Sequence, residues 1–275
     1  MEFRTIVDIP KPDFRIEPCE ELLFVGSCFA DSIGQRFREE GFPVTVNPYG
    51  TMYNPASVLH TIEKYEGEPR TAFITLGTNH VYRLKETGEI VDNCEKRPQA
   101  LFQEEELSVD ACADYLQQAI EVLRRRRPDV RVVMTVSPIR YRKYGYHESQ
   151  VSKATLLLAI EKVMADNRFL PSDAIAGHAT YFPAYEIVMD ELRDYRFYAA
   201  DMLHPSAQTV EYIWERLVET YFSPEAKAFL DEWRPLKQTL GHKPFNPDSE
   251  EYRTLMDKTM LKVAELRKKY STFAL

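Results

Sequence analysis

The chain has 275 residues, of which 44% are hydrophobic, so it can bury a large core in one domain or in a domain with an appendage. Its formal net charge of -8 at pH 7 argues against a nucleic-acid-binding protein, because phosphate contacts need clustered cations. No apolar run approaches the length of a membrane span, and the first residues lack the apolar core of a signal peptide, so we expect a cytoplasmic protein without a membrane partner.

The first predicted element is a buried strand near residues 21–26, which runs directly into a helix near residues 28–40. Gly41 is a typical residue to follow the end of that helix. Ser27 and Cys28 are thereby placed at a helix N-terminus, where free N–H groups and the helix dipole stabilise a thiolate or an oxyanion. Two alternatives stay open at this point: Cys28 is inert core, or Ser27 is simply an N-cap.

Strands and helices continue to alternate along the next part of the chain. Strands are predicted near 42–46, 72–76 and 130–136, and helices near 54–65, 108–126 and 149–165. This alternation predicts an α/β fold in which helices cover both faces of a parallel sheet, with the site beyond the carboxyl ends of the strands. Between Asn79 and Asn93, an alternating pattern and the turn at Glu86–Glu89 predict a hairpin insertion.

A loop near residue 201 places a carboxylate and an imidazole just before another predicted helix. Asp201 and His204 stand close enough in the sequence for the carboxylate to lie beside the imidazole while both face one cleft. The residues after Ser206 form a strongly amphipathic helical pattern. His204 is therefore a candidate base, and an ordinary loop histidine is the alternative.

Beyond about residue 223 the pattern changes, because prolines separate two helical stretches at Glu225–Leu240 and Ser249–Tyr270. We therefore predict a main domain over residues 1–222 and a helical C-terminal extension over residues 223–275. The extension would pack on the domain or on another subunit, which leaves room for a homo-oligomer. The four cysteines and six histidines show no metal-ligand spacing, so we expect no metal and no cofactor.

Several segments of the chain resemble the GSCFA family, whose signature stands at residues 26–30. The other matching segments are Val46–Gly50, Tyr53–Pro55, Leu76–Thr78, Ser137–Arg140, Tyr181–Glu186 and Asp201–Pro205. That family is similar in turn to the SGNH (GDSL-like) hydrolases. The resemblance implies an SGNH-like, flavodoxin-like three-layer α/β fold, with the superfamily's four sequence blocks in their usual order.

The resemblance also implies the nucleophile and its partners. The nucleophilic Ser of the superfamily aligns with Cys28, which ranks Cys28 above Ser27 as the nucleophile. His204 would then be the base, and Asp201 would orient it.

The second and third blocks of the superfamily supply oxyanion donors, which would here be Gly50 and Asn79. Either residue could instead be an ordinary turn residue. In the third block the Asp that follows the Asn in the superfamily is replaced by His80.

The sequence therefore predicts an ester hydrolase that removes a small acyl group, such as acetyl, from a carbohydrate or metabolite. An acyltransferase that uses a thioester donor is one alternative. The other is a carbohydrate- or peptide-binding protein that kept the scaffold without the chemistry, which the exchange of Ser for Cys and the replaced Asp both favour.

Overall fold

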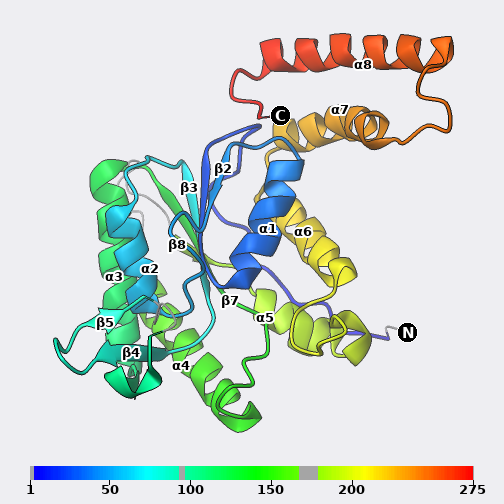
Figure 1. Ribbon diagram of the computed structural model, residues 1–275. Helices are drawn as coiled ribbons and strands as arrows, with labels where there is room; N and C mark the ends of the chain where they lie inside the picture. The colour runs from blue at the N-terminus through cyan, green and yellow to red at the C-terminus, as the bar shows by residue number, and fades with distance from the viewer. Residues whose placement is uncertain (1–2, 93–96, 167–178, 275) are drawn as a thin grey trace.

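A five-stranded parallel sheet forms the centre of the computed structural model, which describes residues 3–92, 97–166 and 179–274 (Figure 1). Its strands, in spatial order, are β2 (Val44–Val46), β1 (Leu22–Gly26), β3 (Thr71–Leu76), β7 (Arg131–Val136) and β8 (Ala179–Tyr181). Every residue of β1 and β3 is buried, as expected for strands that are covered on both faces.

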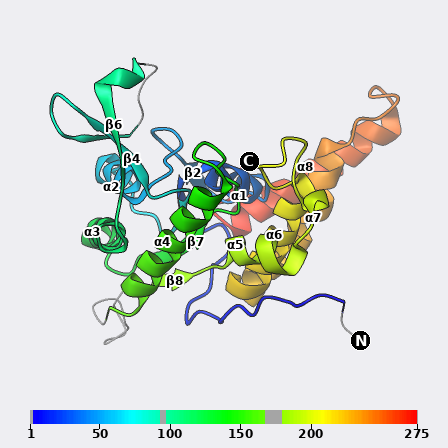
Figure 2. The same ribbon diagram turned by 90° about the horizontal axis from the view of Figure 1, so that it is seen from below.

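Helices cover the two faces of this sheet (Figure 2). On one face, Phe24 and Phe73 stack at a centroid distance of 4.4 Å and pack with α1 (Cys28–Glu39) and α6 (Ala207–Tyr221). The helices of the other face are α2 (Pro55–Lys64), α3 (Val109–Arg126) and α4 (Tyr146–Met164). The predicted three-layer α/β architecture is confirmed.

A small antiparallel sheet is inserted between β3 and α3. Its strands are β4 (His80–Leu84), β5 (Ile90–Val91) and β6 (Phe102–Glu106), with a 3-10 turn at Gln99–Leu101. The β4–β5 pair confirms the predicted hairpin, although its expected end at Asn93 lies outside the described residues. The strand β6 was not predicted.

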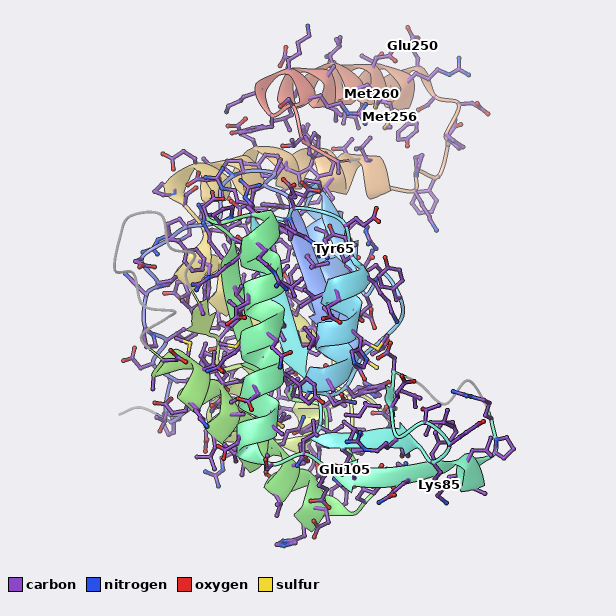
Figure 3. The ribbon with its side chains drawn as sticks, turned by 90° about the vertical axis from the view of Figure 1, so that its left-hand side faces the viewer. Tyr65, Lys85, Glu105, Glu250, Met256 and Met260 are labelled. Atoms are coloured by element: carbon purple, nitrogen blue, oxygen red, sulfur yellow. The ribbon has the colours of Figure 1, made fainter. Side chains whose placement is uncertain are left out.

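The chain after β8 is helical. It contains α5 (Ala184–Glu186), a π-helix at Ile187–Leu192, a 3-10 turn at Tyr195–Phe197, α6, α7 (Pro224–Gly241) and α8 (Glu250–Lys269). Figure 3 shows α8, marked by Met256 and Met260, at the opposite end of the molecule from the inserted sheet, marked by Lys85 and Glu105. The predicted C-terminal helices are confirmed, while the domain boundary at residue 222 stays a prediction.

The core is continuous from the sheet into the C-terminal helices. Phe229 and Trp233 of α7 and Val263 of α8 belong to the same buried cluster as Phe24 and Phe37. In the part of the chain that the structure describes, no helix has both the length and the apolar character needed to cross a bilayer.

Candidate functional site

The first strand ends at a position where only glycine fits. Gly26 adopts a φ of +139°, and a Cβ atom built on it would lie 2.0 Å from the carbonyl oxygen of Thr75. The backbone N–H of Ser27 donates to that oxygen at 3.0 Å, so β1 stays against β3 to its last residue. The chain then turns directly into α1, with Cys28 as the first helical residue. The predicted strand-to-helix turn is confirmed.

Ser27 and Cys28 occupy different environments at this turn. The Ser27 side chain is buried, its hydroxyl lies 3.1 Å from the Thr75 hydroxyl, and it accepts the N–H of Phe29 at 3.3 Å. Ser27 is thus the N-cap of α1, as one sequence alternative expected. Cys28 is only half-buried, and its Sγ lies 3.4 Å from the hydroxyl of Tyr53.

Two further cysteines are described by the structure, and both differ from Cys28. Cys19 and Cys112 are buried, and this burial raises the pKa of each thiol to about 12. A thiol with such a pKa is inert at neutral pH, because the thiolate is the reactive form. Among the cysteines within the described ranges, Cys28 is therefore the one open to a substrate.

The loop between β2 and α2 is fastened to the Cys28 turn through one asparagine. Asn47 accepts the N–H of Gly26 at 2.9 Å through Oδ1 and donates through Nδ2 to the Asp31 carboxylate at 2.8 Å. The hydroxyl of Thr51 donates to the other oxygen of Asp31 at 3.2 Å. These bonds hold the loop across the end of β1 and the first turn of α1.

The same loop carries Tyr53 to the thiol. The carbonyl oxygen of Tyr53 accepts the N–H groups of Gly77 at 2.8 Å and Thr78 at 2.9 Å, so the residue is fixed to the end of β3. Burial, and next the hydrogen bond with Cys28, raise the pKa of the Tyr53 hydroxyl above its ordinary value. Sequence reasoning did not select Tyr53, although it stands in one of the segments that carry the family resemblance.

The two residues expected to supply oxyanion donors are engaged elsewhere. Gly50 has a φ of +98° in an exposed turn, and its N–H donates to the carbonyl of Asn47 at 2.9 Å. Asn79 is buried, and its side-chain N–H donates to the carbonyl of Leu107 at 2.8 Å. His80, which stands in place of the superfamily Asp, stacks on the Tyr144 ring with the two ring centroids 4.0 Å apart.

Asp201 and His204 form the pair that their spacing predicted. The Nδ1 of His204 lies 2.6 Å from Oδ2 of Asp201, and Oδ1 of Asp201 accepts the N–H groups of Leu203 at 2.9 Å and His204 at 3.0 Å. These backbone bonds, followed by the side-chain bond, lower the pKa of Asp201 to about 2. With Nδ1 held by the carboxylate, Nε2 is the nitrogen left to move a proton.

The Asp201–His204 pair and the Cys28 thiol lie at the same edge of the sheet, the one formed by the carboxyl ends of its strands. The helices that follow them, α1 and α6, run side by side (Figure 1), with Arg36 Nε 2.7 Å from Glu211 and the Phe37 ring 4.8 Å from Trp214. The loop after β7 also reaches the pair, because the N–H of Arg140 donates to the carbonyl of Leu203 at 3.0 Å. Within the described chain no hydrogen bond joins Cys28 to His204.

The groups gathered at this edge are polar side chains of several kinds. Nowhere in the described ranges do three or more His, Cys, Asp or Glu side chains come together as potential ligands. What the edge does offer is a thiol, a neutral phenol, and an imidazole held by a carboxylate.

Several solved structures have a similar chain path and share little sequence identity with this protein. An acetyl esterase variant crystallised with acetate is 10% identical with a TM-score of 0.45, covering 78% of this chain and 99% of its own. A carbohydrate esterase family 3 protein from Talaromyces cellulolyticus is 9% identical with a TM-score of 0.43, covering 78% and 99%. A protein described as a GDSL-like lipase from Parabacteroides merdae is 11% identical with a TM-score of 0.45, covering 76% and 98%.

No curated protein matches the sequence. The sequence profile of the GSCFA family matches residues 21–73 and 66–217, a span that includes the Cys28 turn and the Asp201–His204 loop. A second profile, described as the C-terminal domain of GSCFA domain proteins, matches residues 233–275. Together the two profiles cover most of the chain, and the protein belongs to the GSCFA family.

Proposed function

We propose that this protein is an ester hydrolase that works through a thioester on Cys28 and removes a small acyl group, such as acetyl, from a carbohydrate or metabolite. The observation that carries this proposal is the accessible thiol at the start of α1 on the sheet edge that also holds the Asp201–His204 pair. The helix dipole and the free N–H groups at a helix N-terminus favour the negative charge that develops there during an attack on a carbonyl.

In this mechanism His204 takes the thiol proton, and the thiolate attacks the ester carbonyl. The ester C–O bond then breaks, the alcohol leaves with the proton from His204, and the acyl group stays on sulfur. Water then attacks the thioester carbonyl and gives a proton to His204; the C–S bond breaks, the acid leaves, and His204 returns the proton to the sulfur. Asp201 fixes the imidazole by its bond to Nδ1. Because no hydrogen bond joins Cys28 and His204 within the described residues, substrate binding or a loop movement must bring them into contact.

The decisive experiment is peptide-mapped mass spectrometry after brief exposure to p-nitrophenyl acetate and an acid quench. We expect an acetyl group on Cys28 in the wild type, and loss of both adduct and nitrophenol release in Cys28→Ala. Ser27→Ala should keep the adduct, because the Ser27 hydroxyl is a buried cap, while losing about 1 kcal/mol of stability.

Other outcomes would assign the site differently. An adduct on Ser27 would exchange the roles of the two residues. If neither residue carries an adduct and no nitrophenol is released, a binding protein on the same scaffold becomes the better description. Faster turnover on addition of an acceptor alcohol would favour the acyltransferase alternative.

A further inference from the structure

The hydrolase proposed above needs hydrogen-bond donors for the negative oxygen that forms when the thiolate attacks. The donors assigned by family resemblance are compromised here, because the Gly50 N–H donates to Asn47 and the side-chain N–H of Asn79 donates to Leu107. Freeing the Gly50 N–H would cost an existing hydrogen bond, and Asn79 is buried with one of its two side-chain N–H groups already bonded. A donor beside the sulfur is better placed, because its contact with the sulfur is no longer needed once the sulfur has bonded to the carbonyl carbon.

The Tyr53 hydroxyl lies in that position. It is 3.4 Å from the Cys28 Sγ, and the residue Tyr53 is 39% exposed, so a substrate can approach it. The oxyanion is the oxygen atom of the carbonyl carbon that bonds to this sulfur, and a donor next to the sulfur is therefore close to the developing charge.

Tyr53 is also rigidly placed, which an electrostatic donor requires. Its carbonyl oxygen is held by two N–H groups from the end of β3. Its ring passes so close to Gly77 that a Cβ atom there would lie 3.3 Å from Cδ1 of the tyrosine. The Tyr141 ring lies at a centroid distance of 6.3 Å from the Tyr53 ring. A donor held in this way needs no reorganisation when the charge appears.

The phenol keeps its proton under working conditions. Burial raises the pKa of Tyr53 above its ordinary value, and its hydrogen bond to Cys28 raises that pKa further. At neutral pH the hydroxyl therefore carries the proton that it would donate to the oxyanion.

We propose that the Tyr53 hydroxyl is the side-chain donor of the oxyanion hole, in the place expected for Gly50 and Asn79. The inference rests on the proposed function. When the thiolate forms its bond to the carbonyl carbon, the C=O electron pair moves onto oxygen, and the Tyr53 O–H donates to that oxygen without giving up its proton. When the electron pair on this oxygen re-forms the C=O bond, the ester C–O bond breaks, and the Tyr53 hydroxyl moves back toward the sulfur.

The test compares two reactions of the same thiol in Tyr53→Phe. Acetylation by p-nitrophenyl acetate forms an oxyanion, whereas alkylation by iodoacetamide displaces iodide directly and forms none. We expect Tyr53→Phe to slow acetylation of Cys28 on the order of a hundredfold while alkylation stays within about threefold across the pH profile. Tyr49→Phe is the matched control, because it removes a hydroxyl that bonds to the Lys64 carbonyl in the same loop.

Two results would overturn the inference while leaving the proposed function intact. One is equal acetylation in Tyr53→Phe and the wild type. The other is an alkylation profile displaced to higher pH in Tyr53→Phe, which would make Tyr53 a positioning residue for the thiolate. Failure of the wild type itself to acetylate Cys28 would instead reject the proposed function. Circular dichroism and thermal melting of both variants would establish that the fold is kept.

A second measurement uses the substrate in place of the protein. Replacing the carbonyl oxygen of p-nitrophenyl acetate by sulfur weakens its capacity to accept a hydrogen bond. The wild type should strongly prefer the oxygen ester, and Tyr53→Phe should lose most of that preference. An unchanged preference would contradict a hydrogen bond from Tyr53 to this atom.

Discussion

At the scale of single residues, the Asp201 carboxylate has one function that its contacts define closely. It holds the His204 imidazole through Nδ1 and accepts two N–H groups of its own turn. In Asp201→Asn the amide can fix the wrong tautomer of His204, so the acylation rate should fall about 10²- to 10⁴-fold. Stopped-flow release of nitrophenol measures this rate.

The effect of pH on the Asp201–His204 turn follows from the direction in which the Asp201 pKa is shifted. The folded pKa of Asp201 is about 2 against an ordinary 3.8, so its stabilising effect is present above the ordinary value and is lost as the pH falls toward 2. We therefore expect no loss of activity from Asp201 between pH 5 and 8. Asp248→Asn, an exposed carboxylate on the C-terminal extension, is the control for charge. Equal rates in Asp201→Asn and the wild type would remove the pair from the mechanism.

The residues of the site differed in how well the sequence could predict them. The Cys28 turn and the Asp201–His204 pair could be predicted, because each depends on local features: a strand that ends at glycine, a helix start, and a short spacing. The contact between Tyr53 and Cys28 could not, since it depends on Asn47 and on the end of β3. The donors at Gly50 and Asn79 remain predictions, although the Gly50 N–H bonds within its own turn and one Asn79 side-chain N–H bonds to the distant Leu107, a contact that the sequence does not show.

At the scale of elements, one buried lysine joins the carboxyl ends of two central strands. Lys153 of α4 is fully buried, and its Nζ donates to the carbonyls of Gly77 at 2.7 Å and Ser137 at 2.8 Å. Lys153→Met keeps a similar volume but leaves both oxygens without this donor. We expect a loss of about 2 kcal/mol in the free energy of unfolding at pH 7, measured by urea denaturation.

The contribution of Lys153 to the free energy of unfolding also varies with pH. Burial lowers its folded pKa to about 7, below the ordinary 10.5, so the unfolded chain binds more protons above pH 7. The stability of the wild type should therefore rise relative to Lys153→Met from pH 7 to 9, by at most about 1.4 kcal/mol per pH unit. Lys162→Met on the same helix, which removes an exposed ion pair with Asp110, should show no such difference in slope. A wild-type advantage that stays flat from pH 7 to 9 would contradict a neutral lysine.

The elements that sequence patterns missed are those whose stability comes from their partners. The strand β6 has the sequence Phe-Gln-Glu-Glu-Glu, which lacks strand alternation, and it forms because it pairs with β4. The strand β8 has only three residues and extends the sheet by pairing with β7. The long strands and helices were predictable, because their own burial pattern specifies them.

At the scale of the whole molecule, the two ends of α1 serve different parts of the protein. Cys28 begins the helix, and Gly41, just after its end, meets the C-terminal tail. A helix of 12 residues is about 18 Å long, which separates the proposed chemistry from the contact with the extension. Stability and reactivity should therefore respond separately to changes at the two ends.

The C-terminal tail offers the variant that tests this separation. Phe273 packs edge-on against Trp233 at 5.0 Å and lies so close to Gly41 that a Cβ atom there would be 2.1 Å from its ring. The following residue, Ala274, donates its N–H to the carbonyl of Gly41 at 2.9 Å. The C-terminal tail is thus attached to the end of α1 through close apolar packing of the Phe273 ring.

Phe273→Ala should lower the free energy of unfolding by about 3 kcal/mol, because it leaves a cavity between α7 and the end of α1. Phe245→Ala, which removes a fully exposed ring of the same extension, should change it by less than about 0.5 kcal/mol. Both variants should acetylate Cys28 at the wild-type rate per folded molecule at 25 °C, because the tail lies at the far end of α1. A matching loss of acetylation in folded Phe273→Ala would instead mean that the extension controls the position of α1, and with it the thiol.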